Sequence, residues 1–261
     1  DGAPCLVLGV APRLAPATAD DDTFSMTGNE AEKGVVIFSL LRFEIVLDLD
    51  VDATGEDMEG GDDHPSTEPL TVQCLCTQEQ EGVTVRVFAG ASRGPRGPVH
   101  ILSWELPGGR LVSMIPMPMT QDVPSAILCM CTDSLSGNLW VGIDDGGLLV
   151  FSAETGRLLH TLDCIEQGNP RAATSAVCAC SGFGILFALT AHTTVTVWDL
   201  STMQMLHRYP ADLMTCGEHL TCMRILAVSS AQPGNSAAIA LALGSTDGSL
   251  CLRRVSRRED G

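Results

Sequence analysis

The sequence is poor in aromatic residues and in positive charge. Phe, Trp and Tyr make up 4% of the 261 residues, and Lys33 is the single lysine. A core must therefore be built from aliphatic side chains, Cys and Met, because hydrophobic residues still reach 45%. This content, with a mean hydropathy of +0.20, argues against a disordered chain. The net charge of −17 repels phosphate backbones and argues against nucleic acid as a ligand.

Signatures of catalysis, phosphate binding and metal binding are also missing. No Gly-x-x-x-x-Gly-Lys-[Ser/Thr] loop, His-x-x-x-His pair or Gly-x-Ser-x-Gly elbow occurs, so no enzyme, cofactor or metal site is expected. The opening residues reach Pro4 without a basic region, which predicts no signal peptide. The uncharged stretches 172–191 and 225–246 have membrane-spanning length, but Gly, Ser, Pro or Asn interrupt them, and membrane insertion is not expected.

What the sequence does contain is an internal repeat. An apolar anchor recurs in segments such as GLLVFSA and TVTVWDL, and its step is 47 residues from Trp104 to Phe151 and again to Trp198. Phe38 opens the series, and Arg253 takes the anchor position in a fifth segment, SLCLRRV. Turns at Asp145-Gly146 and Asp247-Gly248 precede two of these segments and are typical of two-residue hairpins. Four short strands per unit at this period indicate the blades of a β-propeller.

The segment TVTVWDL, with Trp198 and Asp199, resembles the signature of WD repeats, as does the run from Leu139 to Leu159. The resemblance covers about residues 70–255 and implies an all-β propeller of four-stranded antiparallel blades that binds other proteins. It also implies a buried hydrogen-bond network in each blade, of which Trp198 and Thr190 could supply two members here. The Gly-His dipeptide of the family is missing and His192 stands where the family usually has Asp, so packing should stabilise the blades more than this network.

The repeat divides the chain into blades and parts of blades. The predicted division is a partial first blade at 1–50, an acidic inserted loop at 51–70, blades at 71–118, 119–165 and 166–212, a partial last blade at 213–256 and a tail at 257–261. The first blade should lack its inner strand and the last its outer strand. About four and a half blades are thus predicted, as part of a larger propeller or of one completed by strands from a partner. An internal alternative pairs strand Cys5–Val10 with Leu250–Val255.

The 11 cysteines include three Cys-x-Cys pairs that are predicted to be equivalent between blades. The pairs are Cys74/Cys76, Cys129/Cys131 and Cys178/Cys180, with Cys222 in register. A spacing of two places both sulfurs on one face of a strand, which we interpret as core packing, with a metal or redox site as the alternative. The odd number of cysteines and their spacing favour a reducing, cytoplasmic location.

Charged residues outside the repeat are the candidate partner-binding residues. They are Asp57, Glu59, Asp62 and Asp63 of the acidic loop, and Arg93 and Arg96. We predict a protein–protein interaction scaffold within a multiprotein complex or a larger multidomain protein, with partners that carry basic patches. The alternatives are a propeller that senses a phosphate or a lipid headgroup through Arg93 and Arg96, or a propeller enzyme.

Overall fold

The computed structural model describes residues 5–10, 34–39, 44–50, 70–80, 83–93, 97–106, 108–120, 123–164, 173–190, 194–209, 219–229 and 238–256. Of residues 5–50, and of residues 70, 84, 93, 119, 120, 123, 124 and 227–229, the backbone alone is described. In these parts of the chain the structure consists of β-strands and turns, with a single 3₁₀ turn, η2 (Ser181–Phe183). No helix among the described residues is long and apolar enough to cross a membrane.

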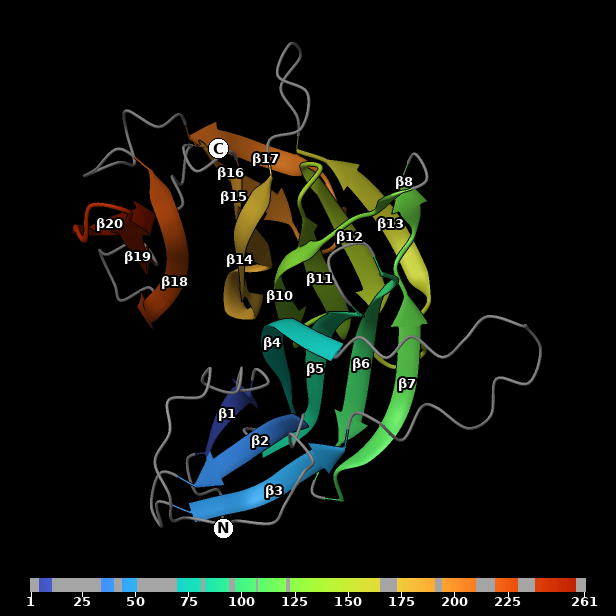
Figure 1. Cartoon of the computed structure of the whole chain (residues 1–261). Coiled ribbons are helices and arrows are strands. Elements are labelled where there is room, and N and C mark those ends of the chain that lie inside the picture. The colour runs from blue at the N-terminus through green and yellow to red at the C-terminus, as the bar shows by residue number, and fades with distance from the viewer. Residues whose placement is uncertain are drawn as a thin grey trace, which may run out of the picture.

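The strands form antiparallel sheets in which the order of strands follows the chain (Figure 1). Sheet I contains β1 (Cys5–Val10), β2 (Gly34–Ser39) and β3 (Glu44–Asp50). Sheet II contains β4 (Leu70–Gln80), β5 (Val83–Arg93), β6 (Val99–Glu105) and β7 (Arg110–Pro116). A two-stranded ribbon of β8 (Met119–Thr120) and β9 (Val123–Pro124) follows.

The later sheets repeat this plan. Sheet III contains β10 (Ile127–Asp133), β11 (Asn138–Ile143), β12 (Gly147–Ser152) and β13 (Leu158–Asp163). Sheet IV contains β14 (Thr174–Cys180), β15 (Ile185–Thr190), β16 (Thr194–Asp199) and β17 (Met205–Tyr209). Sheet V contains β18 (Leu220–Ser229), β19 (Ala238–Ser245) and β20 (Leu250–Ser256). The predicted all-β architecture of four-stranded antiparallel units is confirmed in sheets II, III and IV.

Hairpins form at both predicted Asp-Gly turns, but each loop has three residues, 144–146 and 246–248, and not the expected two. Asp145 and Asp247 each accept a hydrogen bond from the backbone N–H two residues later, at 3.3 Å from Gly147 and 2.9 Å from Ser249. The glycine after each aspartate has a positive φ, 90° at Gly146 and 82° at Gly248. Residues that carry a side chain rarely adopt this backbone conformation, and glycine therefore allows the tight turn.

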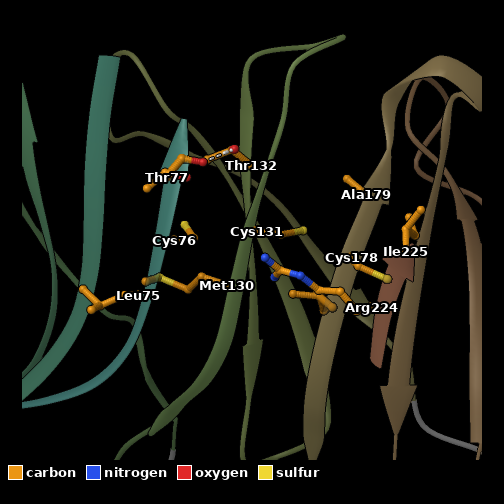
Figure 2. Close-up of a pocket in the computed structure, with 11 residues that line it drawn as sticks. Leu75, Cys76, Thr77, Met130, Cys131, Thr132, Cys178, Ala179, Arg224 and Ile225 are labelled. Atoms are coloured by element: carbon orange, nitrogen blue, oxygen red, sulfur yellow. Dashed lines mark hydrogen bonds between the residues drawn. The ribbon is translucent and has the colours of Figure 1, made fainter. Parts of the chain in front are cut away.

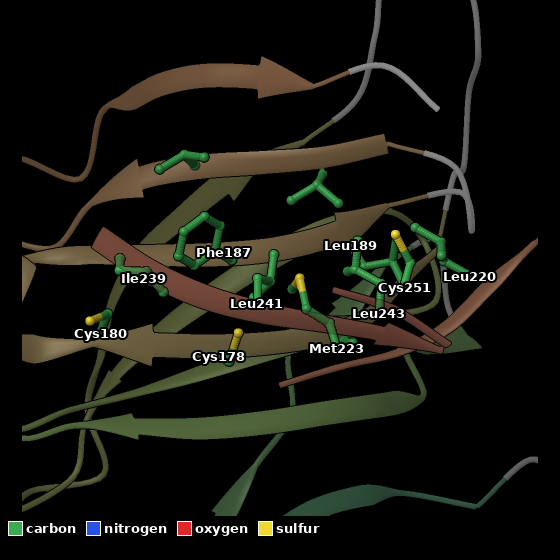
Figure 3. Packing of buried hydrophobic residues seen from close by; sticks show 13 residues of the cluster. Cys178, Cys180, Phe187, Leu189, Leu220, Met223, Ile239, Leu241, Leu243 and Cys251 are labelled. Carbon is green, nitrogen blue, oxygen red and sulfur yellow. The ribbon is translucent and has the colours of Figure 1, made fainter. Parts of the chain in front are cut away.

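The sheets stack face to face around a common centre (Figure 1), and their first strands β4, β10, β14 and β18 contact one another in that order. Each interface is an apolar layer. Figure 3 shows the layer between sheets IV and V, where Phe187 and Leu189 pack against Leu241 and Leu243. A four-stranded sheet has two apolar faces and buries both only between neighbours, which explains the high hydrophobic content.

The register relates the strands of sheets I to IV. In sheets I to IV a β-bulge directly precedes the anchor, and an aliphatic residue of the next strand lies opposite it. The pairs are Phe38–Ile45, Trp104–Leu111, Phe151–Leu158 and Trp198–Met205. By this register β2 and β3 correspond to the third and fourth strands of the complete sheets, and β1 corresponds to the second.

The alternative in which Cys5–Val10 completes the last sheet is wrong. Strand β1 pairs with β2, from Cys5 opposite Ser39 to Val10 opposite Gly34. In sheet V the hydrogen-bonded order of the described strands ends at β20, which pairs with β19. Strand β1 belongs to sheet I, where its Leu-Val-Leu run lies opposite the apolar run of β2 across the ladder.

Candidate binding surfaces

The Cys-x-Cys pairs lie on the first strands, at the centre of the molecule. A β-bulge between the first and second strands fixes their register, at residues 73, 128, 175 and 221. Counted from the bulge, Cys178 matches Cys76 and Cys131, whereas Cys222 matches Cys74 and Cys129. The predicted equivalence of Cys178/Cys180 to the other two pairs is therefore wrong by two residues. The Cys spacing alone does not show how far each pair lies from the bulge of its strand.

The first row of thiols packs against glycines. The opposed pairs are Cys74 with Gly90, Cys129 with Gly142 and Cys222 with Gly244. A Cβ on Gly142 would lie 2.5 Å from the Cys129 sulfur, and a Cβ on Gly244 would lie 2.6 Å from the Cys222 sulfur. The sulfur thus occupies the volume that any larger residue would need, which supports packing as the role of Cys74 and Cys129, whereas Cys222 is exposed.

The described cysteines are free thiols. Burial raises the pKa of Cys74 and of Cys164 to about 12 and raises the pKa of Cys129 further. These thiols stay protonated at neutral pH, and a thiol rather than a thiolate is a poor nucleophile and a poor metal ligand. Among the described residues no three His, Cys, Asp or Glu side chains converge as they would around a metal ion. Metal-free cysteines stay a prediction.

A cavity of about 430 Å³ lies between the first strands, and three of its lining residues are Cys76, Cys131 and Cys178 (Figure 2). Thr132 donates a hydrogen bond of 2.7 Å to the carbonyl oxygen of Thr77 across its wall. The lining is otherwise neutral apart from Arg224, whose guanidinium group points inward in Figure 2.

Arg224 holds the strand position of those three cysteines, but in sheet V. Burial raises the pKa of the Cys178 thiol to about 12, and the charge of Arg224 acts in the opposite direction. Among the described residues, the ion pair found joins Arg110 to Glu105 at 2.9 Å. Arg224 forms no ion pair with any of these residues. Sequence reasoning missed Arg224, although the break of the Cys-x-Cys pattern at Cys222-Met-Arg224 marks it.

A second cavity, of about 830 Å³, opens between sheets II and III. The carboxylates of Glu79, Glu105 and Glu154 line it, and Arg86 crosses it to donate hydrogen bonds to the carbonyl oxygens of Ala153 and Glu154. The hydrogen bond from Arg110 lowers the pKa of Glu105. Three carboxylates thus lie in this groove, Arg110 pairs with that of Glu105, and Arg86 joins the two sheets.

A buried carboxylate joins sheets III and IV. Asp133 is fully buried and accepts hydrogen bonds from the Leu135 N–H at 2.8 Å and from the Ser181 hydroxyl at 3.0 Å, among others. Ser181 lies in η2, the turn of the next sheet, and it also accepts a bond from the Ser134 N–H at 3.2 Å. No sequence motif marks this link, because it joins two turns that are 48 residues apart.

The anchors Trp104, Phe151 and Trp198 are all buried. Phe151 packs between sheets II and III and Trp198 between sheets III and IV, whereas the described neighbours of Trp104 belong to sheet II. The indole N–H of Trp198 donates to the Thr196 hydroxyl at 2.9 Å, and that hydroxyl donates to the Ala188 carbonyl oxygen at 3.3 Å. The expected partner Thr190 is therefore wrong. Residues two apart on one strand share a face, and Thr196 thus lies directly beside the indole.

The other predicted residues fall into two groups. Asp199 accepts hydrogen bonds from the N–H groups of Ser201 and Thr202 at 2.8 and 2.7 Å and thereby shapes the turn after β16. Asp145 and Asp247 act in the hairpin turns described above. The acidic-loop residues Asp57, Glu59, Asp62 and Asp63 and also Arg96 lie outside the described residues, and so do the side chains of Phe38 and Arg93.

No protein-family model matches the sequence, and a search of curated proteins gave no match. Solved structures do match. The chain is similar to the crystal structure of Saccharomyces cerevisiae Sqt1, with a TM-score of 0.59 and 14% identity over 87% of this chain and 54% of that one. It is similar to the RRP9 WD40 repeats and to U3-55K, each with a TM-score of 0.50, at 17% and 16% identity over 70% of this chain and 51% of theirs.

These likenesses concern the fold, and they agree with the stacked four-stranded sheets. The fold is a WD40-type β-propeller. Each of sheets II, III and IV is one blade of this propeller. The chain spans about half the length of the solved structures that it matches.

Sheet V of the propeller has an exposed face. Leu250, Leu252 and Leu226 are 69%, 62% and 59% exposed. In sheet III, the positions of Leu250 and Leu252 belong to Leu148 and Val150, which are fully buried against sheet IV. The exposed face of sheet V is thus the counterpart of a face that other sheets cover with a neighbour.

Proposed function

We propose that the protein is a protein–protein interaction scaffold within a multiprotein complex or a larger multidomain protein. The supporting observation is the outer edge of β20. In sheets II to IV the third strand pairs with a fourth, whereas the described strands of sheet V end at β20. An edge of this kind accepts an extended segment of a partner protein or of flanking sequence through main-chain hydrogen bonds.

The pairing of β19 and β20 indicates which N–H groups face outward. The Ser245 N–H donates to the Ser249 carbonyl oxygen at 3.0 Å, so these two residues form a hydrogen-bonded pair. Because such pairs alternate along an antiparallel ladder, the N–H groups of Leu250, Leu252 and Arg254 point away from β19. A partner strand would accept hydrogen bonds from these three groups.

The charge of the molecule supports partners with basic patches. A net charge of −17 and the carboxylates of the groove between sheets II and III attract cationic surfaces and repel phosphate backbones. The free thiols support a reducing, cytoplasmic setting. The proposed role requires neither a catalytic step nor a cofactor.

The test is native co-purification of partners with the variant Arg254→Pro. Proline removes the outward N–H at residue 254 and leaves the bonds to β19 in place, whereas Arg254→Ala removes the charge and retains the donor. We expect Arg254→Pro to lower partner recovery about tenfold and Arg254→Ala to change it little, with similar melting temperatures. If no protein co-purifies with the intact chain while a metabolite screen gives a ligand, the scaffold role is wrong.

A further inference from the structure

The central cavity of about 430 Å³ is lined by the first strands of four successive sheets (Figure 2). Its lining residues lie at one level, at 75–77 on β4, 130–132 on β10, 177–179 on β14 and 224–225 on β18. Each of these strands pairs with the second strand of its sheet along one edge, and its other edge is turned toward the cavity. Backbone groups as well as side chains therefore line this cavity.

The register shows which backbone groups point into the cavity. In sheet IV the Leu200 N–H donates to the Gly184 carbonyl oxygen at 2.9 Å, and hydrogen-bonded pairs alternate from there across β16, β15 and β14. The N–H of Val177 consequently points away from β15 and toward the cavity. Equivalent bonds in sheets III and II, at 3.1 and 2.9 Å, place the N–H groups of Met130 and Leu75 in the same way.

Contacts across the cavity wall agree with these directions. The inward carbonyl oxygen of Thr77 accepts the hydrogen bond of 2.7 Å from the Thr132 hydroxyl in the next sheet. The N–H of Ala179, two residues after Val177, donates to the sulfur of Cys131. Polar backbone groups thus point inward at every second residue of the first strands.

Arg224 carries the positive charge of the cavity. No Asp or Glu occurs among the described residues that line it. Arg224 takes the strand position that Cys76, Cys131 and Cys178 hold in the other sheets, and its guanidinium group points into the cavity (Figure 2). Burial raises the pKa of the Cys178 thiol to about 12, so this thiol stays neutral and does not compensate the charge.

We propose that the central cavity binds the carboxylate of an organic monoanion that has an apolar body. The guanidinium group of Arg224 offers two parallel N–H donors in the geometry that a carboxylate accepts. The inward N–H groups of Leu75, Met130 and Val177 are further donors on the opposite walls. The aliphatic and thiol groups of the lining pack against the apolar body. This inference goes beyond the scaffold function and does not depend on it.

Charge and volume decide the class of ligand. One guanidinium group balances one negative charge, and the net charge of −17 disfavours a polyanion. Arg224 repels a cation, and protonated thiols are poor metal ligands. A volume of about 430 Å³ accommodates a small organic molecule. A free carboxylic acid and the carboxyl terminus of a peptide both carry this chemistry.

Isothermal titration calorimetry with phenylacetate tests the site in the intact protein. Phenylacetamide has nearly the same shape without the charge and is the matched control ligand. We expect phenylacetate to bind about tenfold more tightly or better, because the amide cannot form charge-assisted hydrogen bonds to Arg224. This comparison requires no variant. Equal affinity of the acid and the amide overturns the inference.

Two variants show whether Arg224 holds the carboxylate. Arg224→Gln removes the charge and should weaken phenylacetate binding about tenfold. Arg224→Lys keeps the charge and loses the planar fork, so its effect should be smaller. Arg157→Gln, at an exposed arginine just before β13, is the control and should leave the affinity unchanged. Melting temperatures verify that the variants fold, and unchanged affinity in folded Arg224→Gln contradicts the proposal.

A peptide distinguishes the two sources of the carboxylate. Acetyl-glycyl-leucine with a free carboxyl group is compared with its amide and with phenylacetate. Tighter binding of the free-carboxyl peptide identifies a peptide terminus as the ligand, and tighter binding of phenylacetate identifies a free carboxylic acid. If neither acid binds, the inference is wrong.

The two proposals can fail separately. Arg254→Pro should lower partner recovery and leave phenylacetate binding unchanged. If phenylacetate binding depends on Arg224 while no protein co-purifies, the scaffold function is wrong and the carboxylate site stands. If partners co-purify while the acid and the amide bind equally, the scaffold function stands and the carboxylate site is wrong.

Discussion

Gly142 of β11 faces the sulfur of Cys129 so closely that a Cβ at this glycine would lie 2.5 Å from it. The added carbon would also meet the backbone oxygen of Thr174 at 2.8 Å, in the next sheet. The contact therefore couples pairing within sheet III to stacking on sheet IV, and it explains why a glycine occurs inside a buried strand.

Gly142→Ala should destabilise the protein by about 1–3 kcal/mol, because backbone in the next sheet cannot move away cheaply. Urea unfolding measures this loss. Gly244→Ala should cost less stability, because the added carbon would meet the Cys222 sulfur alone and no backbone atom. The second change Cys222→Ala should then restore the lost stability. Gly108→Ala, with nothing within 4 Å of the new carbon, is the control. Equal losses in all three would show that packing against the thiols does not matter.

Trp198→Ala should cost roughly 3–5 kcal/mol, as expected for a buried aromatic residue. Trp198→Phe keeps most of the packing and loses the bond to Thr196, so its loss should be about 1 kcal/mol. Leu206→Ala, at a residue that is 55% exposed, serves as the control for denaturant unfolding. A loss under about 1 kcal/mol for Trp198→Ala would mean that the anchor does not hold the sheets together.

Asp133→Ala should destabilise the protein by about 1–3 kcal/mol, because it leaves buried N–H and hydroxyl donors without their acceptor. Ser181→Ala should lower the free energy of unfolding by a smaller amount. The loss in the double variant should be less than the sum of the two single losses, since both changes break the same contact. Asp163→Ala, at an exposed position of β13, is the control. Additive losses would show that the two residues do not act together.

Stability should fall at alkaline pH because burial raises the thiol pKa. The unfolded chain releases the Cys164 thiol proton above about pH 9, whereas the folded chain retains it until about pH 12. The free energy of unfolding therefore decreases as the pH rises between these two values. Cys164→Ala should reduce this slope by up to about 1.4 kcal/mol per pH unit. Urea unfolding from pH 8 to pH 10.5 measures it, and an unchanged slope would contradict burial of this thiol.

Cys222 should be more reactive toward a maleimide than the buried thiols, because its side chain is exposed. Cys222→Ala should remove one equivalent of fast-reacting thiol from the native protein, whereas Cys164→Ala should remove none.

Elemental analysis of the same preparation should show no stoichiometric metal. One bound zinc per chain would contradict the packing role of the cysteines.

The sequence by itself determined the repeating unit. The anchors at Trp104, Phe151 and Trp198 and the turns at Asp145 and Asp247 are local signals, because strand periodicity and positive φ depend on near neighbours. These signals were sufficient to predict four-stranded antiparallel sheets and buried anchors.

Only the tertiary structure decided which residues meet. The Cys178/Cys180 pair lies two places further from the shared bulge than the other pairs do, the indole of Trp198 bonds to Thr196, and Arg224 lies opposite Ala242. These relations depend on cross-strand register and on stacking between sheets. A single extra residue in a strand changes the register without altering the local pattern, so the sequence cannot specify it alone.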